Sequence, residues 1–234
     1  MSSFDYISEQ LAQVRARIAQ AEAQAGRAAG SVRLLAVSKT FPAEAVAAAQ
    51  AHGQLAFGEN YVQEAVAKIQ ALPAQLEWHC IGPLQSRKSG LVAQHFAWLQ
   101  SLDRLDIAQR LSRQRPAELP PLQVCLQVNM DGGANKSGLP PEQVLEFAQQ
   151  VQALPQLQLR GLMSIPEPYD DVAQTLAVHQ RTKALFDEVG AALQLPQWDT
   201  LSMGMSGDLE QAVTAGSTMV RIGTAIFGGR PAKA

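Results

Sequence analysis

Apolar residues recur along the chain in two different patterns. In residues 6–25, Ile7, Leu11, Val14 and Ile18 are spaced four, three and four positions apart. This is the spacing of one apolar face of an amphipathic helix. Further along, short apolar runs alternate with polar loops and helix-like stretches. Eight runs predict strands, over residues 32–37, 55–57, 78–81, 96–99, 122–128, 157–163, 198–201 and 218–222.

Helix-like segments lie between these runs. They begin near Pro42, Tyr61, Gln85, Arg104, Pro140, Asp171 and Gly207. Strands that alternate with helices indicate parallel βαβ units. Both a closed (β/α)₈ TIM-type barrel and an open doubly wound sheet are α/β folds. Eight such units in 234 residues favour the barrel. The extra N-terminal helix is expected outside the barrel or across its bottom. No Gly- or Ser-rich linker interrupts the pattern, so residues 1–234 are expected to form a single domain.

Composition supports a large core and argues against several classes of partner. Hydrophobic residues make up 47% of the chain and charged residues 17%, and the net charge is −2. This balance gives no reason to expect nucleic acid or a membrane surface as a partner. No signal peptide and no run of eighteen apolar residues is visible, which indicates a cytoplasmic protein. Cys80 and Cys125 lie in apolar runs and are interpreted as reduced core residues.

Polar clusters directly follow the predicted strands, and in this barrel fold such positions meet at one mouth. Lys39 ends the run LLAVSK. Partial desolvation there favours the neutral amine, which attacks a carbonyl carbon to form a Schiff base. The alternative is an ordinary strand-end lysine whose ammonium group reaches solvent.

A phosphate site is predicted after strands seven and eight. Ser206 and Gly207 open a helix, where free N–H groups and a hydroxyl suit a dianion. Gly223 and Thr224 would add backbone donors, and these two loops often bind phosphate in such barrels. The alternative is that Ser206, or Asp208, only caps the helix.

Arg221 lies inside the last strand, between apolar neighbours. A buried guanidinium needs an acceptor, which is either a core carboxylate or a ring nitrogen of a ligand. Asn60, His79 and Met203 are weaker candidates for the same site. Asn60 could instead cap the following helix, and a lone histidine in an apolar strand is usually a core residue with satisfied hydrogen bonds. Lys136, in the loop after strand five, is a weak candidate for contact with an anion. Four scattered histidines without neighbouring ligands make a metal site improbable.

Six segments together resemble one family, the YggS/PROSC-type pyridoxal phosphate homeostasis proteins. They are LLAVSKTFP, FGENYVQEA, WHCIGPLQSRK, NKSGL, RGLMSIP and LSMGMSGDLEQAVTAGSTMVRIGTAIFG. The resemblance implies a barrel like the N-terminal domain of alanine racemase. It also implies pyridoxal 5′-phosphate (PLP) on Lys39, with Ser206, Arg221, Gly223 and Thr224 around it. Cys80 departs from the usual Phe or Met of the family.

Two functions are compatible with this resemblance. One is a PLP carrier, which implies PLP-dependent apo-enzymes as possible partners and is expected to be a monomer. The other is an amino-acid racemase, which needs a second base opposite the lysine. The sequence ends soon after strand eight, and neither Tyr61 nor Tyr169 has the context of such a base. The sequence therefore favours the carrier without catalytic turnover.

Overall fold

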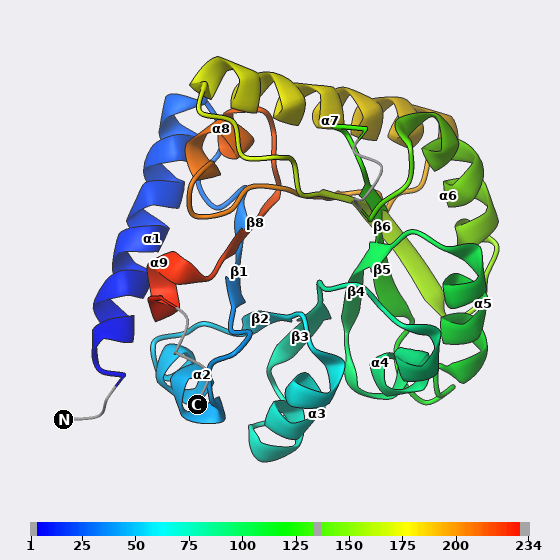
Figure 1. Ribbon diagram of the computed structural model, residues 1–234, viewed down its shortest axis with the longest axis horizontal. Helices are drawn as coiled ribbons and strands as arrows, with labels where there is room; N and C mark the ends of the chain where they lie inside the picture. Colours follow the sequence, from blue (N-terminus) through cyan, green and yellow to red (C-terminus); the bar gives the residue numbers. More distant parts are fainter. Residues whose placement is uncertain (1–3, 133–136, 230–234) are drawn as a thin grey trace.

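The computed structural model describes residues 4–132 and 137–229, which form a closed barrel of eight parallel strands surrounded by helices (Figure 1). Each strand pairs with the next in the sequence, and the last pairs with the first. The predicted (β/α)₈ barrel is thus confirmed. Its strands are β1 Arg33–Val37, β2 Ala56–Glu59, β3 Glu77–Cys80, β4 Trp98–Leu102, β5 Leu122–Val128, β6 Leu157–Ser164, β7 Thr200–Ser202 and β8 Met219–Ile222.

The helices form the outer ring. They are α1 Tyr6–Gln24, α2 Ala43–Ala51, α3 Val62–Ala71, α4 Ser89–His95, α5 Leu105–Gln114, α6 Val144–Gln152, α7 Val172–Leu193, α8 Leu209–Thr214 and α9 Thr224–Phe227. Short 3₁₀ turns at Ser86–Lys88 and Pro141–Gln143 precede α4 and α6. None of the helices of the described chain is long and apolar enough to cross a membrane.

Helix α1 lies outside the barrel, beside α8 and α9 (Figure 1). The predicted apolar face is the buried face, since Ile7, Leu11, Val14 and Ile18 are all less than 10% exposed. Burying these four side chains against the ring stabilises a helix whose outer surface is polar.

Two strands extend at least two residues beyond their predicted ends. Strand β2 continues to Glu59, and β4 continues to Leu102. The predicted apolar runs stop before the polar residues Glu59 and Gln100. Both side chains are buried, at 1% and 0% exposure, and both are hydrogen-bonded inside the fold. A buried polar group with partners does not end a strand.

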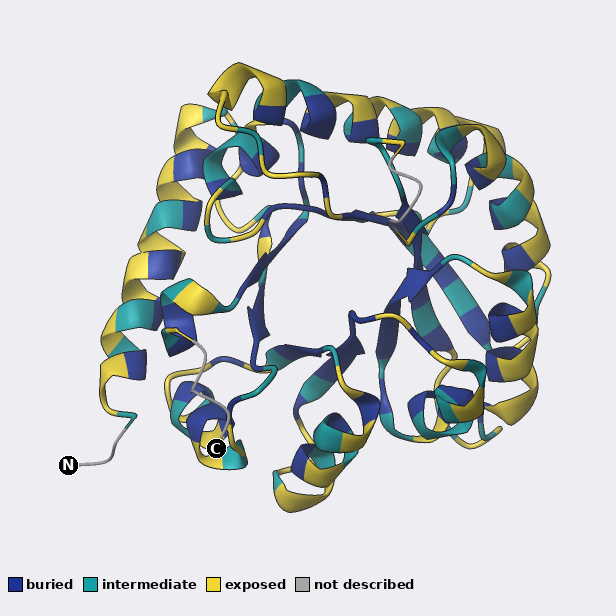
Figure 2. Ribbon diagram, in the orientation of Figure 1, coloured by how far each residue is buried: buried dark blue, intermediate teal, exposed yellow. Residues whose placement is uncertain are grey.

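The core has two layers. The larger one lies between the helices and the barrel, and Figure 2 shows helices that are buried inside and exposed outside. The barrel interior holds smaller apolar clusters, one of them around Trp98, Cys125 and Met163. Both cysteines are free and buried, and burial raises the pKa of each thiol to about 12. Both are free thiols in the core, as predicted.

Candidate ligand-binding site

A cavity of about 350 Å³ opens at the mouth formed by the C-terminal ends of the strands. This volume is within the usual range of small-molecule pockets. The loops after six different strands contribute to it. Its lining consists of Val37, Lys39, Phe41, Asn60, Ile81, Ile165, Met205, Ser206, Gly207, Arg221, Gly223, Thr224 and Gly228. Seven of the nine residues selected from the sequence for this site thus lie around one cavity.

Lys39 reaches the cavity from a tight turn after β1. The N–H of Phe41 donates to the carbonyl oxygen of Ser38 at 3.1 Å, which places Lys39 at the first corner of this turn. Ser38 is fully buried, whereas Lys39 is half-buried. The backbone of the turn is therefore anchored in the core while its lysine side chain lines the cavity.

Arg221 lies on β8 and is 4% exposed. Its Nη1 donates to the carbonyl oxygen of Ser202 at 2.7 Å and to the Ser202 hydroxyl at 2.8 Å. Its Nη2 donates to the carbonyl oxygen of Ser164 at 2.7 Å. Burial lowers the pKa of Arg221 to about 10, so the group stays charged at neutral pH. Within the described chain no carboxylate forms an ion pair with it, which argues against the core-carboxylate alternative.

A chain of hydrogen bonds continues from Arg221 through the barrel interior. The hydroxyl of Ser202 donates to Oε1 of Gln100 at 2.7 Å. The amide nitrogen of Gln100 donates to Nδ1 of His79 at 2.9 Å, and Nε2 of His79 donates to Glu77 at 2.8 Å. Burial lowers the pKa of His79, so its ring is neutral in this chain. Each donor is directed away from the Arg221 cation and toward the Glu77 carboxylate, which stabilises both charges.

Asn60 follows β2 and carries a buried amide oxygen without a hydrogen-bond partner in the described structure. The loop after β3 packs closely against it. A Cβ at Gly82 would lie 2.5 Å from the Asn60 carbonyl oxygen, so only glycine permits this approach. A buried acceptor beside a cavity is suited to a polar ligand, because leaving it without a partner costs free energy.

The turn after β7 brings Ser206 and Gly207 to the cavity. Gly204 begins it with φ +95°, where a Cβ would lie 2.5 Å from that of Ala212. Asp208 fixes the turn by accepting from the N–H of Met205 at 2.6 Å and from His179 at 2.9 Å. Neither Ser206 nor Asp208 caps α8 through its side chain. The Ser206 hydroxyl therefore remains available at the cavity wall.

Gly223 and Thr224 also line the cavity, at the start of α9. A Cβ on Gly223 would lie 3.1 Å from the carbonyl oxygen of Val37, so β1 and β8 approach closely here. The first N–H groups of a helix lack intrahelical acceptors. Backbone donors from this turn, together with Ser206 and Gly207, suit a dianionic group such as a phosphate.

Two weaker candidates lie outside the lining. The His79 ring is stacked on Trp98, with ring centroids 5.0 Å apart, and is bonded to Gln100 and Glu77 below the mouth. Met203 is fully buried in the core between the helices and the barrel. Lys136 lies outside the described residues.

The sequence did not reveal Ser164 and Ser202 as the partners of Arg221, because both are small strand-end residues without a distinctive pattern.

The described residues contain no group of three or more His, Cys, Asp or Glu side chains placed to hold a metal ion. In the cavity itself, Lys39 is the only described lining residue of a type that commonly transfers protons.

Comparison with known proteins gives consistent results. Residues 10–231 match the family described as "Alanine racemase, N-terminal domain". The chain is 54% identical, over 96% of both chains, to the pyridoxal phosphate homeostasis protein of Pseudomonas aeruginosa. It is 52% identical, again over 96% of both chains, to the protein of the same name from Vibrio cholerae.

Solved structures agree with these relatives. The structure of PipY from Synechococcus elongatus with PLP bound is 38% identical, with a TM-score of 0.80. The match covers 95% of this chain and 100% of PipY. Alanine racemase from Corynebacterium glutamicum is 17% identical, with a TM-score of 0.71 over 97% of this chain and 62% of that one. At this identity the likeness to the racemase shows the fold alone.

Proposed function

The chain belongs to the alanine racemase N-terminal domain family and to the pyridoxal phosphate homeostasis proteins, and on this premise we propose that it holds PLP at the barrel mouth. One observation carries the proposal. A single cavity of about 350 Å³ brings together the amine of Lys39, a set of donors suited to a phosphate and the buried Arg221 cation. These are the three kinds of group that a phosphorylated aldehyde on an aromatic nitrogen ring requires.

Seven of the lining residues have a proposed role. The neutral amine of Lys39 would condense with the aldehyde carbon to a Schiff base, and the aldehyde oxygen would leave as water. Ser206 and Gly207, with Gly223 and Thr224, bind the phosphate. When bound, PLP supplies an aldehyde that condenses with amines and a ring that withdraws electrons from them.

The ring end of the ligand is assigned to Arg221 and Asn60. Arg221 has five N–H groups, of which three donate to Ser202 and Ser164. The guanidinium keeps a ring nitrogen unprotonated, because two adjacent positive charges repel each other. Asn60 offers its unpartnered amide to a polar ring substituent.

We further propose that the protein carries PLP without catalytic turnover and takes part in intracellular PLP homeostasis. Racemisation requires a base on each face of the bound amino acid. The described lining contains one lysine but no Asp, Glu, His, Cys or Tyr that could act as a second base. An unprotonated ring nitrogen also makes the ring a weaker electron acceptor. In this proposal the protein acts in the cytoplasm as a monomer and delivers PLP to PLP-dependent apo-enzymes. The competing proposal is that it is an amino-acid racemase.

The cofactor assignment is tested by adding PLP to the purified protein and following the absorbance of the Schiff base. Borohydride reduction followed by peptide mapping should then place the label on Lys39, and Lys39→Ala should lose it. A label on another lysine would overturn the assignment.

The carrier assignment has its own test. The loaded protein is incubated with individual L-amino acids, followed by chiral analysis, and in parallel with a PLP-dependent apo-enzyme. The carrier predicts activation of the apo-enzyme without racemisation. Sustained racemisation that Lys39→Ala abolishes would establish the racemase instead.

A further inference from the structure

The turn that presents Lys39 has an unfavourable backbone conformation. Thr40, the residue after Lys39, has φ +69°. This left-handed region suits glycine, and a β-branched side chain rarely adopts it. The turn therefore needs support from outside its own sequence to keep this geometry.

A buried group of charges lies directly beneath this turn. Nζ of Lys68 is 2.7 Å from Oε1 of Glu59 and 2.7 Å from Oε1 of Glu64. Lys68 is 5% exposed and Glu59 is 1% exposed, whereas the Glu64 side chain is 34% exposed. A buried ammonium is tolerated only when it is paired and hydrogen-bonded, and this one has a third acceptor in the carbonyl oxygen of Ser38, at 2.9 Å.

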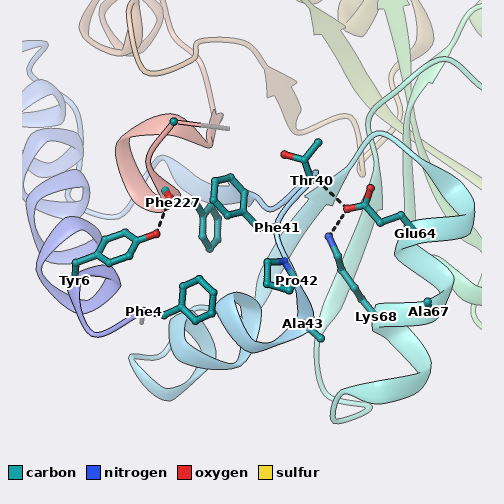
Figure 3. A pocket seen from close by; sticks show the side chains of 11 residues that line it. Phe4, Tyr6, Thr40, Phe41, Pro42, Ala43, Glu64, Ala67, Lys68 and Phe227 are labelled. Carbon is teal, nitrogen blue, oxygen red and sulfur yellow. Dashed lines mark hydrogen bonds and ion pairs between the residues drawn. The ribbon is translucent and has the colours of Figure 1, made fainter. Parts of the chain in front are cut away.

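These three side chains hold the residues on both sides of Lys39. Before it, the Ser38 hydroxyl donates to Glu59 at 2.6 Å and the Ser38 carbonyl accepts from Lys68. After it, the N–H of Thr40 donates to Glu64 at 2.8 Å. Figure 3 shows Thr40, Glu64 and Lys68 joined in this way, beside a groove whose aromatic wall includes Phe41 and Phe227.

We propose that Glu64 and Lys68, together with Glu59, are positioning residues for Lys39. The buried charges of Glu59 and Lys68 and the partly exposed charge of Glu64 hold Ser38 and Thr40 so that the lysine amine is directed into the cavity. The ion pairs of α3 thus set the reactivity of a residue on another element. That the carbonyl compound is PLP rests on the proposed function, whereas the geometry of the turn is independent of it. The competing explanation is that these charges only stabilise the packing of α3 against the barrel.

The primary test measures how fast Lys39 forms a Schiff base. Lys68→Met and Glu64→Met remove the charges while keeping similar volume. Wild type and variants are mixed with PLP, the reaction is stopped with borohydride at set times, and the label on Lys39 is quantified by peptide mapping. The expected result is at least a tenfold slower reaction in both variants, with helix content by circular dichroism unchanged.

Matched controls are available in the same chain. Lys183 forms an i,i+4 ion pair with Asp187 on the surface of α7, and Glu44 is an exposed residue of α2. Lys183→Met and Glu44→Met should leave the rate at the wild-type value. If Lys68→Met does not fold, Glu64→Met carries the test, because Glu64 is partly exposed.

A rescue experiment separates positioning from simple fastening of α3. Glycine adopts φ +69° without strain, so Thr40→Gly in the Glu64→Met background should restore most of the lost rate. Folded variants that react at the wild-type rate would overturn the proposal. So would a loss that Thr40→Gly leaves unchanged.

Failure of the proposed function is distinguishable from failure of this inference. If wild type does not react with PLP, the proposed function is wrong. The same time course with formaldehyde, a small carbonyl probe that needs no phosphate or ring site, would still compare the Lys39 amine in wild type and variants.

Discussion

The amide nitrogen of Gln100 donates to Nδ1 of His79 across 2.9 Å in the barrel interior, and this bond determines which ring nitrogen carries the proton. Nδ1 must accept, so Nε2 is protonated and donates to Glu77. Burial opposes the ionisation of Glu77, but the donors His79 and Arg33 outweigh it and hold the pKa of this carboxyl below its usual range. The charge of Arg221 at the mouth is thereby linked to a carboxylate at the other end of the strands.

The first prediction concerns Gln100→Leu, which interrupts this chain. The change leaves Nδ1 of His79 and the hydroxyl of Ser202 buried without their partner. Each unsatisfied group costs about 1–3 kcal/mol. We expect the free energy of unfolding in urea to fall by about 2–6 kcal/mol. Gln150→Leu, at an exposed position of α6, is the control and should change stability by less than about 0.5 kcal/mol.

A second prediction uses the lowered pKa of His79. Burial makes the folded protein bind this proton less readily than the unfolded chain, whose histidine titrates near pH 6.5. As the pH falls below about 6.5, the free energy of unfolding should therefore decrease, by up to about 1.4 kcal/mol per pH unit. The decrease should end only once the pH passes the folded-state pKa. Above pH 6.5 this contribution is constant.

The measurement is urea unfolding of wild type and His79→Gln between pH 5 and pH 7. Glutamine has no titratable proton, so the variant should show a flatter dependence. The difference between the two curves removes the contribution of other groups, such as Glu59, whose pKa is raised by burial. Parallel curves would mean that His79 does not account for the pH dependence.

A third prediction concerns the phosphate end of the cavity. Ser206→Ala removes one hydroxyl donor, and a hydrogen bond to a charged group is worth about 1.5–3 kcal/mol. The affinity for PLP should therefore fall about 10- to 100-fold. The affinity for pyridoxal, which lacks the phosphate, should remain unchanged. Equal losses for both ligands, measured by equilibrium titration, would remove Ser206 from the phosphate site. Ser8→Ala on α1 serves as the control.

Sequence reasoning succeeded where a single element carries the signal. The face of α1 follows from its spacing, and Lys39, Ser206 and Arg221 line one cavity because parallel strands end at one mouth. It failed where partners are distant in the sequence. Gln100 bonds to Ser202, 102 positions away, and no local pattern indicates such a pair. His79 was a weak candidate for the site, and the alternative, a hydrogen-bonded core histidine, agrees with its 0% exposure and its bonds to Gln100 and Glu77.

The last prediction compares two glycines. Gly204 has φ +95°, and a Cβ there would lie 2.5 Å from that of Ala212. Gly204→Ala combines left-handed strain of about 1–2 kcal/mol with overpacking of about 1–3 kcal/mol. We therefore expect a loss of at least about 2 kcal/mol in urea unfolding, and weaker PLP binding because the turn carrying Ser206 must move.

Gly90 is the control position. It lies in the first turn of α4, and a Cβ added there would contact only Gln114, at 3.8 Å. Alanine is favoured over glycine within a helix, so Gly90→Ala should raise stability by about 0.5–1 kcal/mol and leave PLP binding unchanged. The same chemical change thus has opposite effects at two glycines, because only Gly204 needs the left-handed conformation. A Gly204→Ala protein as stable as wild type would show that the turn after β7 can form without it. The placement of Ser206 would then need another cause.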